Sequence, residues 1–320
     1  MNNLKKIGLS ALAGSLVAVS AQAGSLSVTG AASLTFSNSD TKSHTAEGNQ
    51  WTMGDSITFA GSGEMDNGMT ISVSYELDGD AADTGNSNEL DSHSMTLDTN
   101  GMGTITFAGH GGSSAMSAID DTSPNAYEES WDVVNGAAAP PGGSGGNNMF
   151  TYKSPSVGGA QVTVAYLNAS DAITDVSYMD YAISWSPEMV EGLTVGYGHG
   201  ETEETTGTAV DDTSMYVKYT YGSVTIGYHD GESDGTASSS DIDFEAIGVT
   251  YAVTDDFTIG YHQSKQKKGS DADEQEASAI GASFTSGGIT VGGSMNDIDN
   301  VGYDATNDTD GYEFNIAFAF

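Results

Sequence analysis

The sequence contains no cysteine and no arginine. The first absence excludes disulfide bonds and thiolate-based metal or redox sites, so backbone hydrogen bonds and burial must hold the fold. The second absence leaves eight lysines as the only strongly basic residues against 45 acidic ones, and the formal net charge is −37. Nucleic acid is therefore excluded as a partner, because binding to phosphates needs a basic surface.

Long hydrophobic runs are also lacking beyond the N-terminus. Two lysines precede an apolar run over residues 7–19, and Ala-Gln-Ala follows as a small-x-small cleavage site. This layout predicts a cleaved secretory signal peptide over residues 1–23. No apolar segment in residues 24–320 approaches the length of about 20 residues that a membrane helix needs. We expect an exported chain of this kind to be either a soluble protein or a β-barrel.

Apolar and polar residues alternate with a period of two through residues 24–320, in sixteen separate segments. A strand sends alternate side chains to opposite faces, so the pattern predicts strands with one apolar and one polar face. The last segment ends on an aromatic residue and resembles the closing strand, and hence the assembly signal, of an outer-membrane barrel. Its apolar face consists of Tyr312, Phe314, Ile316, Phe318 and Phe320.

The predicted connections alternate between short Gly-rich turns and long segments. Short periplasmic turns and long outer loops are typical of transmembrane barrels. The long segments hold 31 of the 45 acidic residues, partly because acids generally prefer loops. They span residues 37–50, 78–89, 110–146, 168–175, 199–213, 229–241, 262–276 and 296–310.

Aromatic residues gather near both ends of the predicted strands, as expected for rings at the two membrane interfaces. If the first strand runs outward, the outer ends carry Tyr75, Tyr166, Tyr197, Tyr228 and Tyr261. The inner ends carry Tyr152, Trp185, Tyr221, Tyr251 and Phe320. The fold class predicted is all-β: a transmembrane antiparallel up-and-down barrel of about 16 strands, spanning residues 24–320.

Three short motifs resemble those of the general Gram-negative porins, the sixteen-stranded trimeric type. Residues 57–71 resemble the family's first strand–turn–strand unit, residues 101–109 the strand that leads into its third loop, and residues 147–155 the strand that leaves this loop. The resemblance implies a homotrimer in the outer membrane, in contact with its lipid and inserted by the barrel assembly machinery. It also implies that the third loop folds into the barrel and narrows it. The absence of arginine departs from the basic cluster that many such porins carry on the wall.

The predicted third loop, residues 110–146, is the candidate pore constriction. It contains no lysine, and Tyr127 and Trp131 are candidates for anchoring it to the wall. The alternative is that its acids are solvated on an outward-facing loop. The constriction residues expected are Asp120, Asp121, Glu128, Glu129 and Asp132.

Two lysines have the phase of pore-wall residues, Lys153 and Lys218. They either form a weak basic wall or pair locally with carboxylates. Acids dominate in either case, and acidic rings in a pore favour cations. We therefore expect passive diffusion of cations and small hydrophilic solutes through a water-filled channel. Further acids that contribute where they face inward are Glu76, Asp98, Asp180, Asp243, Glu245 and Glu313.

Other kinds of chemistry find less support in the sequence. No two of the six histidines have the spacing of metal ligands, although His110, His229 and His262 are candidates for facing the lumen. No metal site, cofactor or catalytic residue is predicted, apart from weak divalent-cation binding by the acidic outer loops.

The main alternative function is that of a secreted or surface-layer β-rich structural protein or adhesin. A third possible function is that of a substrate-specific barrel with a dedicated path for a sugar or a peptide.

Overall fold

The computed structural model describes residues 24–41, 48–78, 90–133, 137–168, 176–204, 209–235, 237–271 and 273–320. The predicted signal peptide and parts of several predicted long connections lie outside these ranges. Within them, no helix is both long enough and apolar enough to span a membrane.

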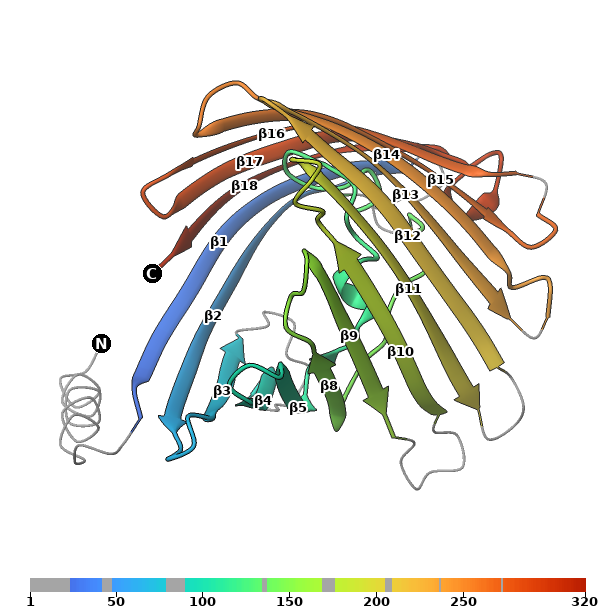
Figure 1. The fold of residues 1–320 in the computed structure, drawn as a ribbon. Helices are drawn as coiled ribbons and strands as arrows, with labels where there is room; N and C mark the ends of the chain where they lie inside the picture. The colour runs from blue at the N-terminus through green and yellow to red at the C-terminus, as the bar shows by residue number, and fades with distance from the viewer. Residues whose placement is uncertain are drawn as a thin grey trace.

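Sixteen antiparallel strands form one closed barrel, as the alternation in the sequence predicts (Figure 1). Each strand pairs with its neighbours in the chain, and the last pairs with the first. The barrel strands are β1 (Leu26–Thr41), β2 (Gly48–Glu64), β3 (Thr70–Asp78), β4 (Ser92–Asp98), β5 (Thr104–His110), β8 (Met149–Lys153), β9 (Ala160–Leu167), β10 (Val176–Trp185), β11 (Leu193–Glu204), β12 (Ala209–Tyr221), β13 (Val224–Gly235), β14 (Ile242–Ala252), β15 (Phe257–Lys268), β16 (Gln275–Ser286), β17 (Ile289–Asp299) and β18 (Thr309–Ala319).

Four short elements lie outside the barrel sheet. The strands β6 (Gly112–Ser113) and β7 (Gly145–Gly146) pair with each other, and the 3-10 helix η1 (Met116–Ala118) lies between them in the sequence. A second 3-10 helix, η2 (Val301–Tyr303), lies between β17 and β18.

The barrel is closed by hydrogen bonds between β1 and β18. Leu34 lies opposite Ile316 and Phe36 opposite Phe314. The backbone N–H groups of Gly30 and Phe320 each donate to the other's carbonyl oxygen at 2.9 Å. The five apolar residues predicted for the last strand all point outward and are exposed. Closure leaves no unpaired sheet edge, which a chain in a membrane cannot tolerate.

The outside of the barrel is apolar and the inside is polar or small, the reverse of a soluble protein. In β14, Ile247, Val249 and Tyr251 are exposed, whereas Ala246, Gly248 and Thr250 lie on the other face; Phe244, further along that face, is covered by Trp131. All ten aromatic residues predicted to form the two girdles are exposed. An apolar surface that runs around a whole barrel requires lipid as its solvent.

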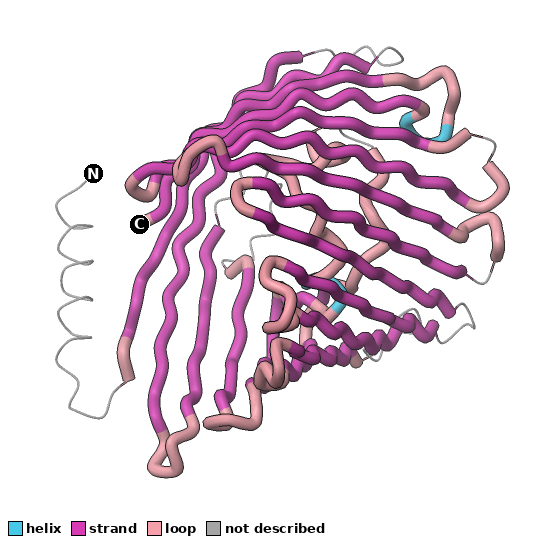
Figure 2. The backbone as a smooth tube through the Cα atoms, turned by 45° about the horizontal axis from the view of Figure 1, so that its top comes forward, coloured by secondary structure: helices cyan, strands magenta, loops and turns pink. Residues whose placement is uncertain are grey.

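The wall is not of equal height around the barrel (Figure 2). β3, β4, β5, β8 and β9 contain only 9, 7, 7, 5 and 8 residues. β13 to β18 contain 11 or 12 residues each. We call the part formed by β3, β4, β5, β8 and β9 the low wall, and the part formed by the other strands the taller wall.

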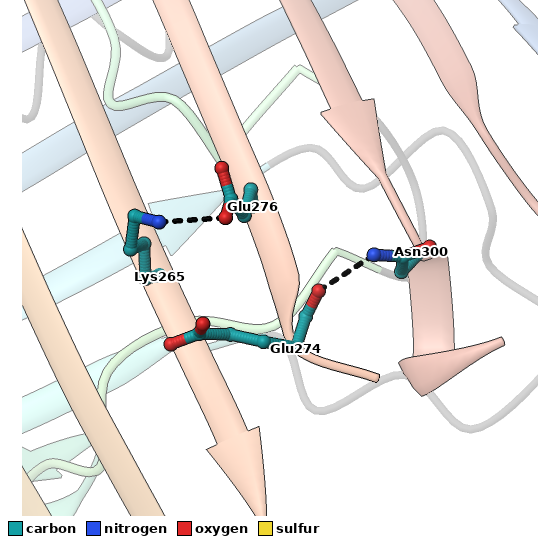
Figure 3. Close-up of polar contacts among 4 residues, drawn as sticks. All are labelled: Lys265, Glu274, Glu276 and Asn300. Atoms are coloured by element: carbon teal, nitrogen blue, oxygen red, sulfur yellow. Dashed lines mark hydrogen bonds and ion pairs between the residues drawn. The ribbon is translucent and has the colours of Figure 1, made fainter. Parts of the chain in front are cut away.

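Polar contacts link neighbouring elements of the taller wall at the end with the long connections (Figure 3). Lys265 Nζ lies 2.6 Å from Glu276 Oε1, and Asn300 Nδ2 donates to the carbonyl oxygen of Glu274 at 2.8 Å. Both partners of the ion pair are well exposed, so it contributes about 0–1 kcal/mol. Backbone pairing, not surface charge, holds these strands in register.

A lysine on the lipid-facing surface is expected to destabilise the barrel far more than one on the inner face. Ile226 points outward on β13 between the two aromatic girdles, which are marked here by Tyr251 (opposite Val224) and Tyr228, and its neighbour Thr225 points inward. Ile226→Lys should lower the free energy of unfolding by about 2–4 kcal/mol, the cost of a lysine at the bilayer midplane. Thr225→Lys should have a clearly smaller effect. Urea unfolding in lipid vesicles measures both, and equal losses would contradict the assignment of the faces.

Candidate functional site

The segment between β5 and β8, residues 111–148, contacts the inner face of the taller wall (Figure 1). At its beginning, the backbone N–H groups of Ala115 and Met116 donate to the Asp180 carboxylate at 3.1 and 2.7 Å. Tyr178 Oη donates to the same carboxylate at 3.1 Å. Asp180 is almost completely buried. A buried carboxylate with three donors is well satisfied, so this contact fixes the start of the segment on β10.

Ser130 and its neighbours make the second set of contacts. The N–H of Ser130 donates to His262 Nδ1 at 3.2 Å, and its Oγ lies 2.9 Å from Ser264 Oγ. Asn296 Nδ2 donates to the carbonyl oxygens of Glu129 and Ser130, each at 3.0 Å. These bonds connect the middle of the segment to β15 and β17.

The two aromatic residues expected to anchor the segment both contact the wall. Trp131 is buried and packs edge-on against Phe244, with ring centroids 5.3 Å apart, and against His262 at 5.1 Å. Tyr127 Oη donates to Glu313 Oε1 on β18 at 2.5 Å. The segment is therefore fastened at several separate strands around the wall.

Glycines on the inner face make room for this segment, a feature that the sequence analysis missed. A Cβ added at Gly248 would lie 2.0 Å from the carbonyl oxygen of Pro124, and one at Gly292 would lie 2.3 Å from the Tyr127 ring. Contacts that close are impossible, so only glycine permits this approach. We call the inward-facing glycines against the segment the glycine track: Gly198, Gly227, Gly231, Gly248, Gly260, Gly281 and Gly292.

Three of the five predicted constriction residues form one cluster. Carboxylate oxygens of Glu128, Glu129 and Asp132 all lie within 4.8 Å of one another. Asp121 lies beside Glu129 and interacts with it electrostatically. Asp120 lies apart from this cluster, and its carboxylate accepts a hydrogen bond from the N–H of Gly143 at 3.2 Å.

Burial and mutual repulsion keep these carboxyl groups from ionising easily. Burial, followed by repulsion from Asp132 and Glu313, raises the pKa of Glu128 to about 7. The pKa of Glu129 is raised further, because Glu129 is more deeply buried and lies beside Asp132 and Asp121. Burial also raises the pKa of Asp120 and Asp121. The charge of the cluster therefore depends on pH near neutrality.

The two predicted pore-wall lysines both have inward phase but lie on distant strands, β8 and β12. Lys153 lies opposite Thr104 and Thr163 on the two neighbouring strands, near the end of the barrel with the short turns. Lys218 lies opposite Gly227, which borders Pro124 of the segment. Neither lysine forms an ion pair with any residue in the described ranges. The structure does not bring them together into a basic cluster.

The further acids and histidines divide between the two faces. Glu76, Asp98, Asp180 and Glu313 have inward phase. Asp243 and Glu245 point outward, in phase with Ile247, so they do not contribute to the charge of the lumen. His229 and His262 point inward and are buried. His110 instead stacks with the outward-facing His93, because a β-bulge shifts the register of β4 and β5.

The glycine track predicts which substitutions disturb the segment. Gly248→Ala would force a methyl group against the Pro124 backbone and should destabilise the protein by about 1–3 kcal/mol, the usual cost of overpacking. Gly281→Ala is a matched control, because its Cβ would meet Tyr127 N at an ordinary 3.5 Å. Urea unfolding and hydrogen exchange of the segment measure the difference. Equal behaviour of the two variants would contradict the proposed contact.

Comparison with known proteins agrees with this architecture. The Gram-negative porin family matches residues 8–281 of the chain. Similar solved structures include an anion-selective porin from Comamonas acidovorans, with 13% identity over 93% of this chain and 100% of that one, at a TM-score of 0.70. OmpF of Salmonella typhi, in complex with daunomycin, is 14% identical in sequence. The match covers 93% of this chain and 98% of that one, at a TM-score of 0.70. OmpT of Vibrio cholerae is 13% identical in sequence, and the match covers 94% of this chain and 99% of that one, at a TM-score of 0.67.

No curated protein was found to match the sequence. At these low identities the solved structures establish the fold, and the match over most of the chain establishes the family. The chain belongs to the Gram-negative porins and is a channel-forming barrel of the bacterial outer membrane.

Proposed function

We propose that the protein is a passive, cation-selective channel for ions and small hydrophilic solutes, and that the segment over residues 111–148 forms its constriction. The observation that carries this proposal is the carboxylate cluster of Glu128, Glu129 and Asp132 on a segment fastened to the inner wall. Asp121 and Glu313 extend the negative charge around the cluster. Carboxylates at a narrow point attract cations and repel anions.

The opposing positive charge is small. Lys153, Lys218 and Lys268 are the inward-phase lysines on the described strands; they lie on three separate strands, and Lys268 Nζ lies over the Tyr303 ring. A similar structure is described as an anion-selective porin, so the fold alone does not determine the sign of selectivity. The lining charge must do so, and in this chain it is negative. No catalytic step is proposed for any of these residues.

We further propose that the protein works as a homotrimer associated through the low wall. A strand needs about 9–11 residues to cross the hydrocarbon core, and β4, β5 and β8 have only five to seven. Contact with another copy of the chain would cover such a wall better than lipid. Chemical cross-linking of the folded protein should give a trimer, and a monomer alone would contradict this proposal.

Selectivity should depend on the exposed carboxylates of the segment. In planar bilayers under a KCl gradient, we expect the native channel to favour K⁺ and the double variant Asp121→Asn/Asp132→Asn to favour it less. One charge 4 Å from a passing ion contributes about 1 kcal/mol in water, so the K⁺/Cl⁻ permeability ratio should fall about fivefold or more. Asp255→Asn/Asp256→Asn, in a short turn, is the matched control. A native channel that favours Cl⁻ would contradict the proposal.

The preference for K⁺ should also increase with pH. Glu128, with a pKa of about 7, is mostly neutral at about pH 5 and mostly charged at about pH 9, so negative charge accumulates as pH rises. Reversal potentials measured across this range should show a step near pH 7. Glu128→Gln should remove that step, and Glu191→Gln, on a short turn, should preserve it. If the step persists in Glu128→Gln, another group is responsible.

A further inference from the structure

Two histidines face each other on the outer surface of the low wall. His93 on β4 lies directly opposite His110 on β5, at a β-bulge next to Ser94. Their ring centroids are 6.4 Å apart and their planes differ by 15°. Tyr75 stacks on the other side of His93 at 6.4 Å, which places all three rings on the outward face. The pair is thus separate from the segment inside the barrel.

A hydrogen bond fixes the tautomer of His110. Its Nδ1 is bonded to the backbone carbonyl oxygen of Asp91. A carbonyl oxygen only accepts, so Nδ1 must carry the proton and Nε2 keeps its lone pair. Histidines that bind metals commonly have this arrangement, in which one ring nitrogen donates to a carbonyl and the other binds the ion.

One ring nitrogen of His93 lacks the hydrogen-bond partner that a buried nitrogen normally has. Its Nδ1 is buried and has no hydrogen-bond partner within the described part of the chain. A buried nitrogen without a partner needs an explanation, and a bound ion is one. The His93 ring lies over Gly109, where an added Cβ would be 2.3 Å from Nε2. Glycine at this position therefore leaves space for the ring beside His110.

We propose that His93 and His110 bind one divalent transition-metal ion, such as Zn²⁺, Cu²⁺ or Ni²⁺, with water completing its coordination. His93 and His110 lie directly opposite each other on neighbouring strands, where Cβ atoms are about 4.5–5.5 Å apart. Rotation of the two side chains can therefore turn one in-plane nitrogen of each ring toward a single ion, about 2.0–2.1 Å from each nitrogen. Imidazole nitrogen selects these metals over Ca²⁺ and Mg²⁺, which prefer oxygen.

The charge of the protein favours occupancy of this site. The chain carries a formal net charge of −37, which raises the local concentration of divalent cations at its surface. The site does not depend on conductance, so failure of the channel proposal would leave it unaffected. It lies on the low wall, where the proposed trimer would bring another copy of the chain, and at the ends of β4 and β5 next to the long connections.

Zinc binding to the untagged, folded barrel in detergent tests the proposal by titration calorimetry. We expect one Zn²⁺ per chain at this site, unaffected by excess Ca²⁺, and binding at least about tenfold weaker in His93→Gln and in His110→Gln. His199→Gln is the matched control, because His199 also lies on an outward face beside a tyrosine, with its ring 5.9 Å from that of Tyr181. Heat-modifiable mobility on gels shows that each variant is folded.

Copper binding to the native protein provides a test that needs no variant. Electron paramagnetic resonance of one equivalent of Cu²⁺ should show coupling to two imidazole nitrogens. Coupling to one nitrogen or none would overturn the proposal. So would equal Zn²⁺ affinity in the native protein and both histidine variants, or displacement of Zn²⁺ by Ca²⁺, which would assign the ion to carboxylates.

Discussion

The structure depends on the need to pair every backbone N–H and C=O group that lies in the hydrocarbon layer. No water is available there, so a sheet that spans a membrane must close on itself. The bonds between Gly30 and Phe320 and the pairing of β1 with β18 satisfy this requirement. Closure then fixes everything else: one face of each strand contacts lipid, and the other faces a space that must hold polar groups and water. A chain without cysteine has no covalent alternative.

The inner face does more than line a space, because its smallest residues determine where the segment over residues 111–148 lies. The glycine track lets the backbone around Pro124 approach β14 more closely than any side chain would allow. Hydrogen bonds that Asp180 and His262 accept and that Asn296 donates then hold the segment at separate strands. The carboxylate cluster sits on this segment, so the position of charge in the proposed constriction follows from the absence of Cβ atoms on the opposite wall.

Much of the barrel could be predicted from the sequence, because a period of two is a local signal and all sixteen strands carry it. The details inside the barrel were harder to predict. In the sequence, Gly248 is only a residue with a low strand propensity, and its sequence neighbours give no sign that Pro124 packs against it. Glu245 was considered for the lumen from its charge, although its phase with Ile247 already indicates the outer face. The pairing of His93 with His110 depends on a β-bulge, which shifts the register without a signal in the alternation.

The segment must stay fastened to the inner wall while the channel conducts if it is to form the constriction. A chain without cysteine allows a direct measurement, because Ser130→Cys/Ser264→Cys would introduce the only two thiols, at positions whose Oγ atoms lie 2.9 Å apart. We expect a disulfide to form readily in the folded barrel. Single-channel conductance and reversal potential should be the same before and after its reduction. Failure to cross-link in the folded protein, or a conductance that changes when the bond is reduced, would show that the segment does not stay at the wall.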